Sequence, residues 1–449
     1  MEQQSALVVR VILCRRFVTL ECETKSEVKR SYFVSGLLYT TIEKRSLKAV
    51  PVYWIIQIST VIIGPILERM ENMAKIKVGI VGCGFIANRK HLPMLAQHED
   101  VEVVAFCDII KERAETSAKQ FGTADAKVYE DYRQLIVRKD IDIVHVCTPN
   151  SSHSEITVAA LQSGKHVMCE KPMAKTSAEA KAMLDAAKAS GKKLTIGYQN
   201  RFRSDSQFIK GLCDKGELGD IYLGKAFACR RRGVPIWGVF MNKELQGGGP
   251  LIDLGTHALD LTLWMMDSYE PVSALGSTYN MIGKMGSPAN GMGAWDPAKY
   301  EVEDSAFGMV KFKNGATVVL EASWAINMIV ANEAMTMLMG TKAGADMFPA
   351  AGPILRVADF QSAESLHVRV NGENNGKLYI QNYTMGAEFI GSGGKKEDFA
   401  GGTLEMQTWL NAIRHDTEVV VKPEQAYTVT RILEAIYKSA ATGQLVHFE

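Results

Sequence analysis

The chain has 449 residues, of which 47% are apolar and 22% charged, and its 51 Lys and Arg residues balance 50 Asp and Glu residues to a net charge of +1. This composition excludes intrinsic disorder, collagen-like repeats and coiled coil as descriptions of the whole chain, and it predicts two or three globular domains. The near-zero net charge gives no electrostatic basis for binding nucleic acid or an anionic membrane surface.

The cysteines indicate a reducing compartment. The chain contains eight of them, and none belongs to a C-x-x-C pair, which argues against a zinc ribbon or a thioredoxin-type site. Four fall in apolar, strand-like runs, where a free cysteine behaves as a small buried hydrophobe. We therefore expect a cytoplasmic protein.

Residues 1–72 do not match the rest of the chain and show no sustained helical or strand period. The segment 49–67 carries no charge and is long enough to be a transmembrane candidate. A translation start at Met73, directly before the first regular strand, is the simpler interpretation. We therefore expect 1–72 to lie outside the natural fold, as a mis-assigned start or else as an anchor, and we expect no membrane contact for the folded domains.

From residue 75 onward the pattern becomes regular. Strand-like apolar runs alternate with helical segments, at 76–81, 103–107, 141–147, 166–169 and 194–197. This alternation is typical of βαβ units and a parallel sheet. The pair Thr176 and Glu179 forms a capping box, and Gly191 is placed to end the helix that the box begins. We expect a dinucleotide-binding domain of the Rossmann type at 73–197.

The first turn of this domain reads Gly82-Cys83-Gly84-Phe85-Ile86-Ala87, a G-x-G-x-x-A motif between a strand and a helix. Gly82 permits the tight turn, and Gly84 lets the backbone approach a pyrophosphate at the helix N-terminus. A lone glycine triplet is a weak signal, but this one has the strand before it and the helix after it that the motif requires. The turn residues Gly82, Gly84, Phe85 and Ile86 are therefore candidate cofactor contacts.

The second strand ends at Asp108. An acid at this position accepts hydrogen bonds from the ribose hydroxyls of adenosine and repels a 2′-phosphate, so the expected cofactor is NAD rather than NADP. The alternative is that Asp108 is only the N-cap of the helix that begins near Lys111.

Two further motifs carry a family resemblance. The strand at 144–147 runs into Thr148-Pro149-Asn150-Ser151-Ser152-His153, and the strand at 166–169 runs into Glu170-Lys171-Pro172. With the glycine turn at these spacings, they resemble the glucose–fructose oxidoreductase/inositol dehydrogenase (Gfo/Idh/MocA) family over about residues 75–449. The resemblance implies an α/β chain, with an N-terminal Rossmann domain and a C-terminal α+β domain at 198–449 built on a large, open, mostly antiparallel sheet.

The same resemblance assigns roles to the motif residues. It implies that Asn150 and Glu170 contact the nicotinamide end of the cofactor and that Lys171 points at the substrate. Further candidate cofactor contacts are Thr148, His153 and Lys171. Lys171 follows the C-terminal end of a strand, where open α/β sheets bind ligands. A cationic nicotinamide beside Lys171 would lower its pKa. The alternatives are a solvated loop lysine at 171 and a histidine at 153 that only caps its helix.

A candidate acid–base pair lies in the second domain. Asp253 and His257 are four residues apart on a helix that opens at Pro250, so both side chains are expected on one face, where the carboxylate can orient the imidazole and stabilise its protonated form. The family resemblance places this pair beside Lys171. The alternative is a buried, hydrogen-bonded histidine. No third and fourth ligands have a suggestive spacing, so we expect no metal.

Other parts of the second domain are predicted as sheet and packing helix. The segments 304–313 and 316–325 alternate around Asn314-Gly315, which predicts a hairpin, and an apolar stripe predicts a helix over 423–441. Further candidate substrate contacts follow the last Rossmann strand and the next apolar run: Tyr198, Asn200, Arg201, Arg230 and Trp237. The arginines at 230–232 could instead form an exposed charged edge.

The connection 279–303 is the last informative segment. It carries Met281, Met285, Met292, Trp295 and Tyr300 among glycines. Glycines give mobility and methionines an adaptable apolar surface, so we expect a lid over an aglycone; the alternative is a subunit interface.

The sequence thus predicts an NAD-dependent oxidoreductase that oxidises a secondary hydroxyl of a sugar or glycoside, at the 3-position of a glycoside such as a flavonoid glycoside. In this scheme His257, supported by Asp253, removes the hydroxyl proton and Lys171 binds the same oxygen. The alternatives are an inositol or polyol dehydrogenase, a glycosidase-type enzyme that uses NAD transiently, and a dinucleotide sensor without turnover. The resemblance also implies a homo-oligomer.

Overall fold

The computed structural model describes residues 8–14, 17–24, 27–34, 37–41, 75–328, 331–347, 365–374, 377–386 and 401–449. Contacts divide the chain into two units, Met1–Met73 and Ala74–Glu449. Among the described residues, no helix is long and apolar enough to cross a membrane. The transmembrane candidate 49–67 lies outside the described residues.

The first unit contains a four-stranded antiparallel sheet in chain order. Its strands are β1 (Val8–Cys14), β2 (Phe17–Thr24), β3 (Glu27–Val34) and β4 (Leu37–Thr41). This differs from the expectation of no sustained period. The strands are rich in β-branched and aromatic residues, and only two residues separate successive strands, which favours hairpins. That 1–72 lies outside the natural fold stays a prediction.

The second unit begins with a six-stranded parallel sheet in the order β10-β9-β8-β5-β6-β7. Its strands are β5 (Ile76–Val81), β6 (Val101–Cys107), β7 (Lys127–Tyr129), β8 (Ile143–Val146), β9 (His166–Cys169) and β10 (Leu194–Ile196). The order reverses at β5, which pairs with β6 on one side and β8 on the other. Ligands of open α/β sheets bind at this kind of switch point, beyond the carboxyl ends of the strands.

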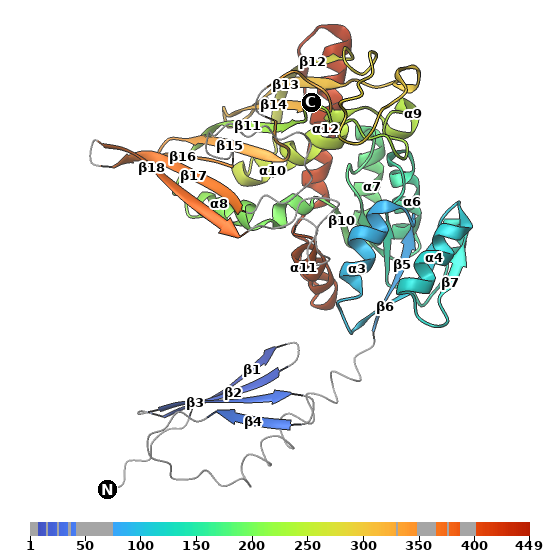
Figure 1. Ribbon diagram of the computed structural model, residues 1–449, viewed down its shortest axis with the longest axis vertical. Coiled ribbons are helices and arrows are strands. Elements are labelled where there is room, and N and C mark those ends of the chain that lie inside the picture. Colours follow the sequence, from blue (N-terminus) through green and yellow to red (C-terminus); the bar gives the residue numbers. More distant parts are fainter. Residues whose placement is uncertain are drawn as a thin grey trace. The chain divides into compact units, whose positions relative to one another are not determined.

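Helices connect these strands (Figure 1). They are α3 (Leu92–Leu95), α4 (Lys111–Phe121), α5 (Tyr132–Ile136), α6 (Asn150–Gln162) and α7 (Ser177–Ser190). The predicted capping box is confirmed at the start of α7, where Thr176 accepts from the Glu179 backbone N–H, and Gly191 ends the helix with a φ of 65°.

A nine-stranded sheet follows, in the order β18-β17-β16-β15-β11-β14-β13-β12-β19. Its strands are β11 (Ile221–Cys229), β12 (Pro271–Tyr279), β13 (Ser305–Phe312), β14 (Thr317–Ser323), β15 (Met335–Gly340), β16 (Ala343–Asp346), β17 (Ser365–Asn374), β18 (Lys377–Gly386) and β19 (Val446–His447). Only β11 and β14 pair in parallel. The predicted hairpin is confirmed: β13 and β14 pair from Ser305↔Ser323 to Lys311↔Thr317, and Gly315 has a φ of 86°. The predicted α/β class, with a Rossmann sheet and a mostly antiparallel second sheet, is confirmed.

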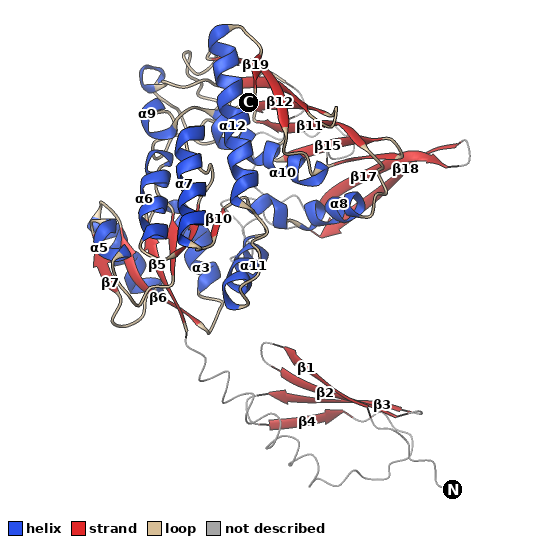
Figure 2. Ribbon diagram, turned by 180° about the vertical axis from the view of Figure 1, so that it is seen from behind, coloured by secondary structure: helices blue, strands red, loops and turns tan. Residues whose placement is uncertain are grey.

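Helices lie along one face of this second sheet (Figure 2). They are α8 (Ser204–Asp214), α10 (Thr256–Met266) and α12 (Pro423–Thr442), with the short α9 (Lys243–Gln246) nearby in the chain. The predicted helix over 423–441 is confirmed as α12. Its apolar stripe is core, since Ile432, Leu433 and Ile436 are buried.

The helix α11 (Gly402–Arg414) belongs to the C-terminal part of the sequence but lies beside α3 (Figure 1). Its Met406, Trp409 and Leu410 join the apolar cluster that holds Val78 and Phe106 of the Rossmann sheet. Thus α12 packs on the second sheet, whereas α11 packs against the Rossmann domain. The division into 73–197 and 198–449 stays a prediction.

Candidate active site

The glycine turn after β5 has the geometry that a bound pyrophosphate needs. Gly82 has a φ of 90°, and a Cβ there would lie 2.6 Å from the carbonyl carbon and oxygen of Cys147. A Cβ at Gly84 would meet no atom within 4 Å, so the backbone is open on that side. The Asn88 side chain donates to the carbonyls of Cys83 and Gly84, both at 2.9 Å, and so fixes the turn.

The other predicted turn contacts lie beside this opening. Phe85 is half exposed, with the Arg89 guanidinium 5.9 Å from the centre of its ring, and Ile86 is partly buried against the Rossmann core. Phe85 is therefore the predicted turn contact whose side chain is most accessible to a ligand.

Asp108 lies at the end of β6 and holds the glycine turn from the other side. Its Oδ2 accepts from the Cys83 backbone N–H at 2.8 Å, and its Oδ1 accepts from the Ile110 N–H at 2.9 Å. The N-cap of α4 is Ile110, so the alternative interpretation of Asp108 as that N-cap is wrong. The carboxylate lies next to the turn, where the ribose of a dinucleotide is expected.

The loop after β8 is tied to its neighbours by side-chain hydrogen bonds. Asn150 donates to the Gln246 carbonyl of α9 at 2.8 Å, and the Thr148 hydroxyl accepts from Ser152 at 2.8 Å. His153 is fully buried, with Nδ1 2.8 Å from the Pro172 carbonyl and Nε2 2.9 Å from the Thr148 carbonyl. The expected cofactor contact by His153 is therefore corrected: both ring nitrogens join the two motif loops to each other.

Glu170 is the centre of a buried polar cluster. Its Oε1 lies 2.6 Å from the Lys90 ammonium and 2.9 Å from His91 Nε2, and its Oε2 accepts from the Lys171 N–H at 3.1 Å. Burial would raise the pKa of this carboxyl, but the Lys90 charge and the His91 hydrogen bond hold it well below its usual value. The cluster thus fixes an ionised Glu170 and the backbone of Lys171.

Lys171 and Asp253 come together from the two halves of the second unit. The Lys171 ammonium donates to Asp253 Oδ1 at 2.9 Å and to the Asp253 carbonyl at 3.1 Å. The indole N–H of Trp324 donates to Asp253 Oδ2 at 2.9 Å. Burial raises the pKa of Asp253, but Lys171 and then Arg230 outweigh it and lower the pKa below its ordinary value. Lys171 is therefore no freely solvated loop lysine.

Asp253 was expected to orient the His257 imidazole, and the structure corrects this expectation. Asp253 directs its oxygens to Lys171 and Trp324, and His257 Nδ1 is buried without a hydrogen-bond partner among the described residues. Asp253 lies in a π-helical turn, Leu251–Gly255, that precedes α10. Such a turn accommodates an extra residue, so side chains four apart no longer stack on one line.

His257 is neutral at pH 7. Burial first, and then the charge of Lys171, put its pKa well below 6.5, although Asp253 acts in the opposite direction. The Tyr198 ring stands edge-on to the imidazole, with centroids 6.3 Å apart, and its hydroxyl bonds the Thr256 hydroxyl at 2.8 Å. The arrangement brings together a lysine ammonium and an unprotonated imidazole, which suit hydroxyl binding and proton abstraction respectively.

Arg201 is not placed to contact a substrate. It is fully buried, and its guanidinium forms a two-point pair with Asp260 at 2.8 and 2.5 Å and also donates to Gln425 at 2.7 Å. A charge so paired joins α10 to the segment after β10, so the expected substrate contact is corrected to a structural role. Asn200 is also buried.

Arg230 and Trp237 differ in exposure. Arg230 pairs with Glu333 at 2.6 Å, is partly buried, and acts electrostatically on Asp253. It therefore does not belong to an exposed charged edge. Trp237 is 45% exposed and lies 6.0 Å from the Phe240 ring, which in turn lies 6.2 Å from Trp324. These rings connect Asp253 with an exposed indole.

The connection 279–303 is more firmly held than expected. Asn290 exchanges hydrogen bonds with the Val234 N–H and carbonyl, both at 2.9 Å, and the Trp295 indole N–H donates to the Gly283 carbonyl at 2.7 Å. Trp295 and Tyr300 are buried, so their expected place on a lid surface is wrong. Met281 and Met285, exposed by 66% and 77%, remain on the surface.

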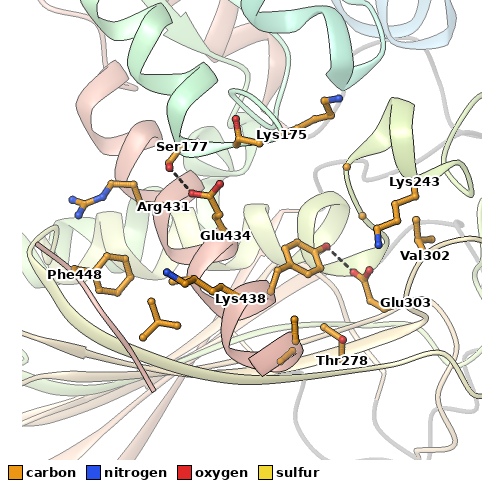
Figure 3. A pocket seen from close by; sticks show the side chains of 18 of the residues that line it. Lys175, Ser177, Lys243, Thr278, Val302, Glu303, Arg431, Glu434, Lys438 and Phe448 are labelled. Atoms are coloured by element: carbon orange, nitrogen blue, oxygen red, sulfur yellow. Dashed lines mark hydrogen bonds between the residues drawn. The ribbon is translucent and has the colours of Figure 1, made fainter. Parts of the chain in front are cut away.

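A cavity of about 960 Å³ is lined by residues of α7, α9, β12 and α12 and by Val302 and Glu303 (Figure 3). Tyr437 donates to Glu303 at 2.8 Å there, and Glu303 accepts from the Gly249 and Leu251 N–H groups at 2.9 and 3.2 Å. Glu303 thereby anchors the start of the turn. None of the predicted site residues lines this cavity.

Five residues of the candidate site were not predicted from the sequence: Lys90, His91, Glu303, Trp324 and Glu405. Lys90 and His91 follow the glycine turn on the stripe that also carries Ala87 and Met94, so charged residues at buried positions were a usable signal. Trp324, Glu303 and Glu405 carry no comparable local signal, because they reach the site only through tertiary packing.

The chain is similar to known protein families and to proteins of known activity. The model described as "Oxidoreductase family, NAD-binding Rossmann fold" matches residues 76–198, and that of the "GFO/IDH/MocA C-terminal domain" matches residues 206–345. The chain is 36% identical over 380 residues to a D-glucoside 3-dehydrogenase of Escherichia coli (strain K12), covering 85% of this chain and 99% of that protein. It is 39% identical over 146 residues to an inositol 2-dehydrogenase of Salmonella typhimurium, covering 32% of this chain and 43% of that protein.

Solved structures share the fold. An aldose-aldose oxidoreductase from Caulobacter crescentus matches with a TM-score of 0.63 and 26% identity, over 83% of this chain and all of that one. A levoglucosan dehydrogenase in complex with NADH matches with a TM-score of 0.68 and 22% identity, over 84% of this chain and 99% of that one. The second likeness concerns the fold alone.

Proposed function

Because the chain belongs to the Gfo/Idh/MocA family of NAD-binding oxidoreductases, we propose that it oxidises a secondary hydroxyl of a sugar or glycoside with NAD, at the 3-position of a D-glucoside. The observation that carries this proposal is the Lys171–Asp253 pair, with the neutral imidazole of His257 beside it. The similarity to a D-glucoside 3-dehydrogenase, which extends over 99% of that relative, supports the substrate class.

The residues present fit a dinucleotide. Open space at Gly84 accommodates a pyrophosphate, and the Asp108 carboxylate at the end of β6 favours ribose hydroxyls over a 2′-phosphate. Phe85, Thr148, Asn150 and Glu170 lie just beyond the carboxyl ends of β5, β8 and β9 and complete the proposed cofactor surface. When bound, NAD supplies the acceptor for the hydride that leaves the carbinol carbon.

The chain's own residues then divide the proton chemistry. His257, unprotonated at pH 7, accepts the proton of the substrate hydroxyl. Lys171 donates a hydrogen bond to the same oxygen and stabilises the alkoxide that develops there. Asp253 positions the Lys171 ammonium, and Trp324 fixes the second carboxylate oxygen. In this scheme Asp253 acts through Lys171 rather than through His257.

An exposed apolar surface favours a glycoside over a small polyol. Ile236 and Trp237 are 39% and 45% exposed, and the ring series through Phe240 leads from them to Trp324 at the site. The connection 279–303 is bonded to the same segment through Asn290. An aryl aglycone, such as that of a flavonoid glycoside, is proposed to lie on this surface while the sugar enters the polar site.

The test is a substrate panel with the full chain and NAD, in which NADH formation is followed by absorbance and the product is identified by NMR. We expect an aryl glucoside to give a 3-keto product, with a higher kcat/KM than glucose or myo-inositol. Preference for myo-inositol would instead favour the inositol dehydrogenase alternative. Glycoside cleavage without net NADH would favour the glycosidase, and NAD binding without turnover would favour the sensor.

Replacement of residues 283–294 by a short Gly-Ser link tests the aglycone surface separately. We expect the aryl glucoside to lose more kcat/KM than free glucose does. Equal losses, or a changed oligomer with unchanged selectivity, would contradict the proposal and favour a subunit interface.

The remaining expectations are proposals about the context of this enzyme. We propose a cytoplasmic homo-oligomer with a Rossmann domain at 73–197 and a substrate-binding domain at 198–449, in which residues 1–72 lie outside the natural fold, as a mis-assigned start or an anchor. The six cysteines of residues 75–449 are free, which is consistent with a reducing compartment. Light scattering on the purified protein tests the oligomer, and N-terminal sequencing of the natural protein tests the start.

A further inference from the structure

A series of buried hydrogen bonds leads from the helix α11 to Glu170. The indole N–H of Trp409 donates to His145 Nε2 at 3.3 Å, and His145 Nδ1 lies 2.9 Å from His91 Nδ1. His91 Nε2 in turn lies 2.9 Å from Glu170 Oε1. The four side chains come from α11, from β8, from the π-helical turn Ala87–His91 and from the residue directly after β9. All four are buried, so bulk water does not compete for these hydrogen bonds.

The two ends of this hydrogen-bond series fix which ring nitrogens carry protons. An indole N–H can only donate, so His145 Nε2 accepts and the proton of this ring lies on Nδ1. The Glu170 carboxyl is ionised, because its pKa lies well below the usual value, and a carboxylate can only accept. His91 Nε2 therefore carries a proton, and His91 Nδ1 accepts from His145 Nδ1–H. The assignments from the two ends agree, so all three hydrogen bonds run in one direction, from Trp409 to Glu170.

The same contacts keep both imidazoles neutral. A second proton on His91 would lie on Nδ1, and His145 would then have to accept there and carry its own proton on Nε2. That proton would face the Trp409 N–H, so two donors would meet at 3.3 Å. A second proton on His145 would meet the same N–H directly. Burial is also the main cause that lowers the pKa of each ring, so the hydrogen bonds and the burial act in the same direction.

The series ends on a carboxylate that is held at both oxygens. Glu170 Oε1 accepts from His91, and the Lys90 ammonium lies 2.6 Å from the same oxygen and 3.1 Å from Glu405. Glu170 Oε2 accepts from the Lys171 backbone N–H at 3.1 Å. A rotation of the carboxylate would therefore break contacts at both oxygens, and one of them leads to the backbone of Lys171.

We propose that His91 and His145 are positioning residues, held by Trp409 in the tautomers that direct hydrogen bonds toward Glu170, and that this series orients Glu170 and the Lys171 backbone for the reaction. The series does not conduct protons, because the indole at its start releases none near pH 7 and so cannot resupply His145. The kinetic part of this inference rests on the proposed function, whereas the two tautomers do not depend on it.

The tautomers are measured on the wild-type full chain, labelled with isotopic nitrogen at its nine histidines. Long-range proton–nitrogen NMR spectra distinguish a ring protonated at Nδ1 from one protonated at Nε2, and the loss of a signal in His91→Gln or His145→Gln assigns it. We expect the Nδ1–H tautomer for His145 and the Nε2–H tautomer for His91 at pH 7. His166 is an internal reference for the Nε2–H form, because its Nδ1 accepts from the Lys193 N–H at 3.0 Å.

Variants at position 145 test whether the direction of the series matters for the reaction. His145→Met removes the acceptor for Trp409 and the donor to His91, so kcat with an aryl glucoside should fall about three- to tenfold, the usual effect of one hydrogen bond. His145→Gln retains a carbonyl that can accept from Trp409 and an N–H that can donate to His91, so kcat should stay within about twofold of the wild type. The matched control His166→Met removes a histidine hydrogen bond from the neighbouring strand β9, and it should lower the melting temperature without changing kcat.

The outcomes separate this inference from the proposed function. The expected tautomers, together with a kcat that falls in His145→Met and is restored in His145→Gln, support the inference. The opposite tautomer or an imidazolium at either ring, or the same kcat in both variants at position 145, would overturn it. If His145→Met does not fold, Trp409→Phe, which removes only the first donor, replaces it and should lower kcat about two- to threefold. A wild-type chain that oxidises none of the substrates would overturn the proposed function, and the tautomer spectra would still decide the direction of the series.

Discussion

Replacing Lys171 by alanine tests whether the ammonium serves the reaction or only the fold. In the wild type, Lys171 contacts Asp253 at 2.9 and 3.1 Å, and Asp253 is otherwise bound by Trp324. The Lys171→Ala variant leaves the Asp253 carboxylate, whose side chain is 7% exposed, with one neutral donor and the more distant charge of Arg230. Both stability and turnover should therefore fall, for different reasons.

The two magnitudes can be stated separately. Loss of one partner of a buried ion pair costs several kcal/mol, and since Lys171 is 18% exposed and Arg230 remains, we expect the free energy of unfolding to fall by about 2–3 kcal/mol. Loss of the hydrogen-bond donor that stabilises the developing alkoxide lowers turnover by about 10²–10³-fold. The affinity for NAD should change little, because Glu170 and the glycine turn stay in place.

The double variant Lys171→Ala, Asp253→Asn separates the two effects. An asparagine at 253 removes the unpaired charge, so the free energy of unfolding should return to within about 1 kcal/mol of the wild type. Turnover should stay low, because the ammonium is still missing. The assays are urea unfolding, NAD titration and steady-state kinetics with an aryl glucoside. Recovery of turnover in the double variant, or wild-type kcat in Lys171→Ala, would refute the reasoning.

Three further outcomes follow from the same contacts. Gly82→Ala should lower the free energy of unfolding by at least about 1–3 kcal/mol, because its Cβ would collide with the chain after β8. Gly84→Ala should keep the wild-type stability and weaken NAD binding more than about tenfold. Urea unfolding measures the first effect and titration calorimetry the second. Arg201→Met should lower the free energy of unfolding by about 3–5 kcal/mol, with little change of KM in the folded protein. Unchanged stability with a raised KM would instead indicate that Arg201 contacts the substrate. Burial lowers the pKa of His145 and His257, so below pH 6.5 the unfolded chain binds protons that the native chain does not. Each histidine should therefore lower the free energy of unfolding on acidification by up to about 1.4 kcal/mol per pH unit. Urea unfolding at pH 7.5 and 5.5 measures this, and a higher stability at pH 5.5 would contradict it.

Local features of the fold were predictable because they depend on near neighbours in the chain. The glycine turn, the Asn314-Gly315 hairpin and the capping box at Thr176 each require particular residues within a few positions, and the structure has all three. The acid at Asp108 and the lysine at 171 were found in the same way, because both lie close to the end of a strand, β6 and β9 respectively.

The predicted partner of His257 was wrong for an identifiable reason. The four-residue spacing was read as a regular helix, whereas Asp253 lies in a π-helical turn. Spacing in the sequence cannot reveal such a turn, because it forms where tertiary contacts, here those of Glu303 with Gly249 and Leu251, fix the start of the helix.

The sequence by itself thus determined the Rossmann sheet and the second sheet's central hairpin, and it predicted the residues Lys171, Asp253 and His257 as the reactive set. The tertiary structure alone decided which charges meet. Lys171 and Asp253 are 82 positions apart, and Trp324 is the residue directly after β14. Glu405 reaches Lys90 only because α11 returns to the Rossmann sheet, and Arg201 is buried in an ion pair with Asp260. No periodicity records such pairings, because their free energy depends on how the folded chain excludes water from both partners at once.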